Sequence, residues 1–132
     1  MSNIPKLFNA LLLDMESFCQ SCGRPFTYDP KRSGSENVVK YCSKKCRREK
    51  RDKKESFLEE EILNLLMSRD HDKTICPSEV ARLLYPDDFK NYMEDIRCAG
   101  RRLVLKEKIT ITQKGREVDT LNFKGPIRFK LK

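Results

Sequence analysis

The chain has 132 residues, which suits one ordinary domain or a small module joined to a modest one. Charged residues make up 36% and hydrophobic residues 38%, so the chain is highly charged yet apolar enough for a small core. It contains no apolar stretch of membrane-spanning length, and residues 7–13 lack the flanks of a signal peptide. These features argue against a membrane protein, and we expect a cytoplasmic one.

The charge is distributed in blocks. The formal net charge is +8. Residues 40–55 carry nine basic and three acidic side chains, residues 56–96 carry four and ten, and residues 97–132 carry eleven and three. Basic blocks suit a polyanionic partner, and nucleic acid is the common one. Solvated surface charge on a small domain is the plainer interpretation of the same pattern.

Helical spacing of apolar residues begins the chain. Ile4, Leu7, Phe8, Leu11, Leu12 and Met15 recur at steps of three and four, which predicts an amphipathic helix within residues 1–16. Residues 17–54 hold four paired cysteines, with a turn-rich loop between the pairs and a short strand expected near residues 38–41. Ser43 is placed to cap a helical stretch over residues 43–69.

The paired cysteines have the spacing of a metal site. Cys19 and Cys22 are followed after nineteen residues by Cys42 and Cys46. Two short turns of this kind can direct four thiolates at one tetrahedral Zn²⁺, which would be structural because no coordination position stays open for water. Free buried cysteines and a redox pair are the alternatives. Reduced thiols in the cytoplasm favour one structural zinc ion over disulfides.

Two motifs around these cysteines resemble known zinc proteins. Residues 19–26 (CQSCGRPF) and 39–43 (VKYCS) are similar to a family of small uncharacterised bacterial zinc proteins. Residues 41–46 resemble the second half of a treble-clef finger, in which the last two ligands open a helix. The resemblance covers residues 18–48 and implies a treble-clef-like or zinc-ribbon-like module. The family tends to carry tryptophans in its loop, and this chain has none.

The rest of the chain, residues 55–132, predicts a second domain. An apolar stripe lies on residues 57–66, with Glu59, Glu60 and Glu61 expected on other faces. A second helix begins at Ser78 and ends before Pro86, and Asp87 or Asp88 caps a third helix. Alternating residues then predict strands at 109–112, near 118–121, and at 127–131. This order is that of a winged helix-turn-helix, so the fold class expected is α+β.

Several segments of this second domain resemble another uncharacterised bacterial family, which is predicted to be winged-helix. They are residues 77–82 (PSEVAR), 96–97, 109–115 (ITITQKG), 118–119 and 125–128 (GPIR). The match covers residues 58–131. It implies a fold and brings no established activity.

The basic residues suggest where nucleic acid would bind. The third helix carries Glu94 and Asp95 near its start, which disfavours base reading in a groove. Cations in its second half and in the turn after it suit phosphate contacts instead. The proposed contacts to DNA or RNA are Lys44, Lys45, Arg47, Arg48, Lys50, Arg51, Arg97, Arg101, Arg102, Lys114 and Arg116. A scaffold that binds a protein partner is an equally weighted alternative.

Other residues give no sign of catalysis. The sequence contains no phosphate-binding glycine loop, nucleophile elbow or catalytic triad pattern, and no small-molecule substrate is suggested. Cys76 and Cys98 are expected as small core residues and His71 as an exposed turn residue. An enzyme with an unfamiliar site remains the weakest of the three hypotheses.

Overall fold

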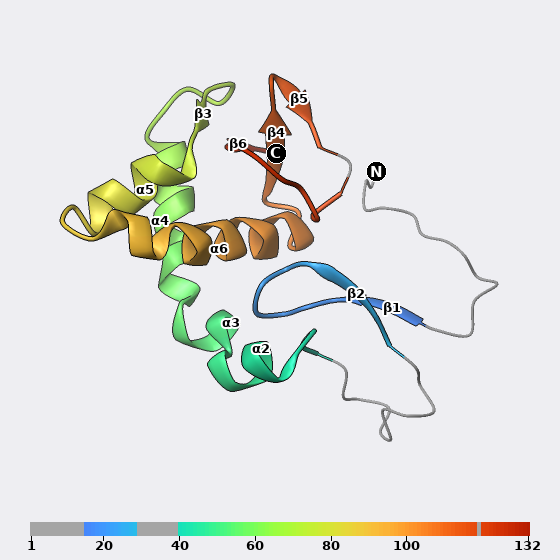
Figure 1. Cartoon of the computed structure of the whole chain (residues 1–132). Coiled ribbons are helices and arrows are strands. Elements are labelled where there is room, and N and C mark those ends of the chain that lie inside the picture. Colours follow the sequence, from blue (N-terminus) through green and yellow to red (C-terminus); the bar gives the residue numbers. More distant parts are fainter. Residues whose placement is uncertain (1–14, 29–39, 119) are drawn as a thin grey trace.

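The computed structural model describes residues 15–28, 40–118 and 120–132 (Figure 1). The amphipathic helix expected within residues 1–16 lies outside this part, except that Met15 and Glu16 belong to a strand. Of the strand expected near residues 38–41, only residues 40 and 41 are described, and neither is in a strand. No helix among the described residues has the length and hydrophobicity needed to span a membrane.

A two-stranded hairpin opens the described chain. Strands β1 (Met15–Phe18) and β2 (Pro25–Tyr28) pair antiparallel, and Phe18 is opposite Pro25. The tight connection between them closes through Gly23, whose N–H donates to the carbonyl of Cys19 at 2.8 Å. Gly23 has φ of 80°, a left-handed conformation that glycine adopts without strain. We call residues 19–24 the knuckle.

The helical stretch predicted over residues 43–69 is confirmed, with two interruptions. It comprises α2 (Lys44–Glu49), α3 (Arg51–Lys54) and α4 (Ser56–Met67). Ser43 caps α2 as predicted, because its side chain accepts from the N–H of Cys46. Lys50 ends α2 in the left-handed conformation, with φ of 45°, and Glu55 separates α3 from α4. The chain therefore turns twice before α4 enters the core.

Three helices and a small sheet form the second half. Strand β3 (Thr74–Ile75) precedes α5 (Pro77–Leu84), and a 3₁₀ turn η1 (Phe89–Tyr92) leads into α6 (Met93–Leu105). Asp88 precedes η1 rather than α6, so the third helix begins later than predicted. Strands β4 (Ile109–Gln113), β5 (Arg116–Glu117) and β6 (Arg128–Leu131) follow. The strand expected near residues 118–121 is wrong, because the described residues there are not in a strand.

The sheet is antiparallel in the order β3-β6-β4-β5. Its central strand β6 places Phe129, which is fully buried, against the helices. The core combines α4, α5, α6 and the inner face of the sheet. In Figure 1 α6 crosses the molecule, with the four-stranded sheet on one side and the β1–β2 hairpin on the other. The fold is therefore mixed α and β, and α6 lies between its two parts.

Candidate metal centre

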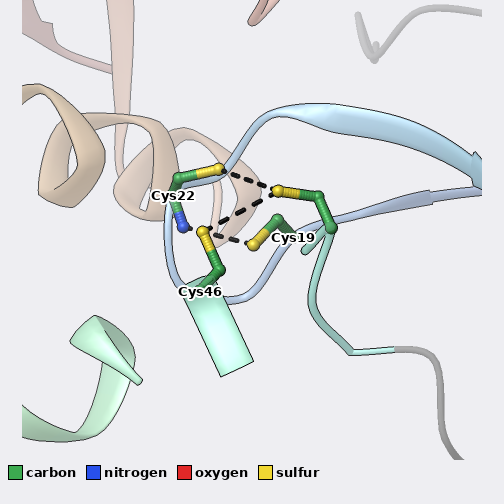
Figure 2. Close-up of side chains that lie close together, drawn as sticks. Cys19, Cys22 and Cys46 are labelled. Carbon is green, nitrogen blue, oxygen red and sulfur yellow. Dashed lines mark hydrogen bonds between the residues drawn. The ribbon is translucent and has the colours of Figure 1, made fainter. Parts of the chain in front are cut away.

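Four cysteine sulfurs converge beside the turn of the β1–β2 hairpin (Figure 2). The Sγ atoms of Cys19, Cys22, Cys42 and Cys46 all lie within 4.8 Å of one another. Two come from the knuckle, one from the residue pair before α2, and one from α2 itself. The sequence spacing predicted this set, and the structure brings all four together.

The sulfur separations match a tetrahedral metal site. Cys22 Sγ is 3.8 Å from Cys42 Sγ, which is in turn 3.8 Å from Cys46 Sγ. Four sulfurs bound at about 2.3 Å in a tetrahedron would be separated by about 3.8 Å. A disulfide needs about 2.05 Å, and all four cysteines are free thiols. The arrangement can hold one metal ion.

The thiols are unequal in exposure and acidity. Cys19, Cys22 and Cys46 are buried, whereas Cys42 is exposed. The hydrogen bond with Cys22 lowers the pKa of the Cys19 thiol to about 4, and the same contact raises the pKa of Cys22. Burial raises the pKa of Cys42. Crowded thiols without a cation therefore resist full ionisation, and a divalent ion would supply the charge that four thiolates require.

Two arginines of α6 reach the knuckle. Arg102 Nη1 donates to the carbonyl of Ser21 at 2.6 Å, and Arg101 Nη1 donates to the carbonyl of Cys22 at 3.1 Å. Arg101 is 1% exposed and Arg102 is 3% exposed. The prediction that they contact nucleic acid is wrong in this conformation, because both guanidinium groups are buried between the two parts of the chain.

The other predicted contacts fall into two groups. Arg51 is half-buried and ion-paired with Glu49 at 2.9 Å and with Asp95 at 3.0 Å, and Arg97 is also half-buried. The remaining predicted contacts are exposed: Lys44, Lys45, Arg47, Arg48, Lys50, Lys114 and Arg116. The exposed set divides between the α2–α3 segment and the turn between β4 and β5.

The residues outside the cluster lie largely as expected. Cys98 is buried beside the metal-site cysteines, and His71 is exposed. Cys76 is half-buried at the start of α5, where it joins a capping box with Glu79. Burial raises the pKa of the Cys98 thiol to about 12, with nearby arginines opposing the shift. These features are consistent with structural roles.

Sequence reasoning missed the buried acid that holds Arg102. Glu59 is 5% exposed and accepts from Arg102 Nε at 2.6 Å and from Lys106 Nζ at 2.6 Å. It was expected on an outer face of α4. The sequence does carry a signal for this burial. Glu59, Ile62 and Leu66 occupy positions i, i+3 and i+7, which lie on one face of a helix.

Comparison with known families divides the chain in the same two parts. Residues 15–49 match a family described as "Uncharacterized protein conserved in bacteria (DUF2256)". Residues 55–132 match a family described as "Protein of unknown function (DUF3253)". No curated protein matches the chain. Because the second match spans more than half of the sequence, the chain belongs to the DUF3253 family, and it carries a DUF2256-like segment with the four cysteines before that domain.

Proposed function

We propose that this protein binds nucleic acid through phosphate contacts made by the basic surface, which we define as the exposed cations of residues 44–54. A zinc module displays this surface, and a winged-helix domain anchors the module. The observation that carries the proposal is the charge on α2 and α3. Seven cations there are exposed: Lys44, Lys45, Arg47, Arg48, Lys50, Lys53 and Lys54.

The acids within this segment do not offset those cations at the surface. Asp52 accepts a hydrogen bond from the hydroxyl of Tyr41 at 3.3 Å, and Glu49 pairs with Arg51 at 2.9 Å. Among the ion pairs between described residues, none involves the seven exposed cations. The side chains therefore remain available for phosphates, where each contact would release a bound counterion.

Zinc is the metal we assign to the four cysteines. Four thiolates in a tetrahedron suit Zn²⁺ or an iron–sulfur centre. A pair of ligands on a knuckle and a pair at the start of a helix is a treble-clef-like arrangement. With four protein ligands, such a site would stabilise the fold and would not activate water. Its proposed role is to fix α2, which contributes Cys46, against the hairpin.

The topology supports a winged-helix assignment for residues 55–132. Helix, strand, two helices and a hairpin follow one another, and three of the four strands lie side by side in the order β3-β6-β4. In that architecture α6 would be the third helix, the one that enters the major groove of DNA. Here the knuckle covers part of α6, and Glu94 and Asp95 lie near the helix start. This favours phosphate contacts over base reading.

The exposed cations of the β4–β5 turn belong to a different surface. In Figure 1 α2 and α3 lie at one end of the molecule, and the β4–β5 turn lies at the opposite end. Lys114 and Arg116, in the β4–β5 turn and on β5, therefore do not belong to the surface that α2 and α3 form. We assign the principal contact to the basic surface.

Binding across a salt series tests the proposal. The zinc-loaded protein would be titrated with mixed-sequence duplex DNA and with structured RNA, together with the variant Lys44→Gln/Lys45→Gln/Arg47→Gln/Arg48→Gln. If all four cations contact phosphates, the slope of log K against log salt becomes shallower by about 3–4 units. The control removes four exposed cations elsewhere: Lys108→Gln/Lys114→Gln/Arg116→Gln/Lys124→Gln. No wild-type binding at low salt, or equal losses in both variants, would refute the assignment.

A protein-binding adaptor is the second candidate function. In the described part of the chain, three large apolar side chains are well exposed, namely Phe57 and Met67 on α4 and Leu83 on α5. Such side chains suit a protein partner better than a phosphate backbone. A partner that stays bound after nuclease treatment, together with no nucleic-acid binding, would favour the adaptor. We propose no catalytic activity.

A further inference from the structure

We infer that the metal centre is a composite of the two family segments, in which Arg101 and Arg102 of α6 hold the cysteine knuckle and control how tightly the metal is retained. The inference rests on the metal site proposed above and is independent of nucleic-acid binding. It assigns a positioning role to two residues of the DUF3253 segment toward a ligand set in the DUF2256 segment.

The contacts are made to the peptide groups that orient the ligands. Arg101 donates to the carbonyl of Cys22, a residue that also supplies a metal-site sulfur. Arg102 donates to the carbonyl of Ser21, the residue before it. Both carbonyls lie in the knuckle, and both arginines are 3% exposed or less. Because these donors are charged and buried, their hydrogen bonds are stronger than ordinary surface contacts.

The backbone of the knuckle lies directly against α6. A Cβ added to Gly23 would stand 2.2 Å from the Cβ of Arg101 and 3.3 Å from its Cα. Helix α3 joins the same interface, since the N–H of Arg51 donates to the hydroxyl of Ser21 at 3.1 Å and its side chain pairs with Asp95 on α6. The knuckle therefore has little freedom to move while α6 stays folded.

Both arginines are held from inside the second domain. Glu59 on α4 fixes Arg102 through the 2.6 Å contact and also binds Lys106. The guanidinium of Arg101 lies over the ring of Phe123, 4.6 Å from its centroid. None of these supports comes from the cysteine module, so the donors are set before the metal binds. Residues that do not bind the metal but hydrogen-bond to the groups around its ligands orient those ligands, and the two arginines are arranged in this way.

Charge balance gives the arginines a second effect. Four thiolates around one divalent cation leave a net charge of about −2, and three of the thiols are buried. Buried positive charge next to the knuckle offsets this excess. When a guanidinium is removed, this excess negative charge is less well balanced, and the site should hold the metal less tightly.

The test compares metal retention in Arg101→Gln, Arg101→Lys and the control Arg97→Gln. Arg97 is on the same helix, and among the described residues no hydrogen bond or ion pair joins its side chain to the knuckle. Zinc transfer to a chelator would be followed at one constant pH. We expect Arg101→Gln to lower zinc affinity by about 10–100-fold. Arg101→Lys keeps the charge and should have an affinity between those of Arg101→Gln and the wild type, and Arg97→Gln should match the wild type.

A spectroscopic readout separates positioning from general loss of stability. Co²⁺ bound at four thiolates reports its geometry through ligand-field and charge-transfer absorption, so Arg101→Gln should change the spectrum while circular dichroism shows a folded second domain. If Arg101→Gln does not fold, the double variant Glu59→Gln/Arg102→Gln tests the inference instead. It keeps an uncharged hydrogen-bonding pair between α4 and α6 and loses the charged donor to Ser21, so faster zinc release is expected.

Two results would overturn the inference. Wild-type zinc affinity and a wild-type Co²⁺ spectrum in a folded Arg101→Gln protein, or in the double variant where that one is needed, would show that the arginines are only packing residues. A wild-type protein that binds no zinc or cobalt would remove the metal centre itself. The first result leaves the metal site and the nucleic-acid proposal intact, so the failures are distinguishable.

Discussion

The contact between α6 and the central strand gives a sharp prediction for Gly100→Ala. A Cβ built on Gly100 would stand 2.3 Å from Cε1 and 2.5 Å from Cζ of Phe129. Carbon atoms in contact normally lie about 3.5–4.0 Å apart, so the ring would have to move by more than about 1 Å. Phe129 is fully buried on β6, between β3 and β4, so displacing its ring would disturb the core.

Two opposing effects decide whether Gly100→Ala raises or lowers the free energy of unfolding. Replacing a helical glycine by alanine favours the helix by about 1 kcal/mol. Overpacking a core costs about 1–3 kcal/mol, and the double overlap with one rigid ring places this site at the upper end. We therefore expect a net loss of about 2 kcal/mol in the free energy of unfolding, or a fall of about 1 M in the urea midpoint.

The assay is urea unfolding of the zinc-loaded protein followed by circular dichroism. Asn64→Ala, at an exposed site on α4, is the control that gains helix propensity without a clash. Phe129→Leu makes room, so the double variant Gly100→Ala/Phe129→Leu should be more stable than the two single losses predict. Gly100→Ala as stable as the wild type or more so would refute the packing argument.

Three further changes test the cysteine module and its junction with α4. Cys42→Ser should abolish stoichiometric zinc binding, measured by metal analysis, whereas Cys76→Ser, outside the cluster, should keep one ion per chain. Gly23→Ala should weaken zinc retention more than Gly115→Ala, because both glycines have positive φ but only Gly23 touches Arg101; equal effects would count against the interface. Burial raises the pKa of Glu55, so the folded state binds this proton more tightly than the unfolded state. Its stability contribution is therefore present below about pH 4 and lost as pH rises through the folded pKa. Glu55→Gln should be more stable than the wild type at pH 7 but not at pH 4 in urea melts, whereas Glu60→Gln, at an exposed site, should change little.

The metal ligands could be predicted because their geometry is local. Each cysteine pair lies within a single turn, so spacing alone nearly determines whether two sulfurs can share an ion. The helix cap at Ser43 could be predicted for the same reason, since its hydroxyl accepts from the N–H of Cys46, only three residues away. The two pairs are separated by only nineteen residues, and binding of one metal ion would itself favour bringing them together.

The pairing of the two segments could not be predicted in the same way. Arg101 and Arg102 lie about eighty positions beyond the carbonyls that they bind, and a sequence gives no register for such contacts. A count of charges treats every arginine as surface charge, so both were expected on a phosphate-binding face. Glu59 is different, because its position in line with Ile62 and Leu66 could have indicated a buried acid and hence a buried cation near it, although it was expected on an outer face.

Burial of these arginines changes which surface can attract a polyanion. Residues 97–132 have the larger excess of basic residues, but Arg101 and Arg102 are buried, Lys106 is bound by Glu59, and Arg128 donates to Thr74. The α2–α3 segment instead keeps seven exposed cations within eleven residues. Because α2 also carries Cys46, the basic surface depends on the element that the metal would hold in place. Zinc removal should therefore weaken the proposed nucleic-acid binding, although the metal itself would contact no phosphate.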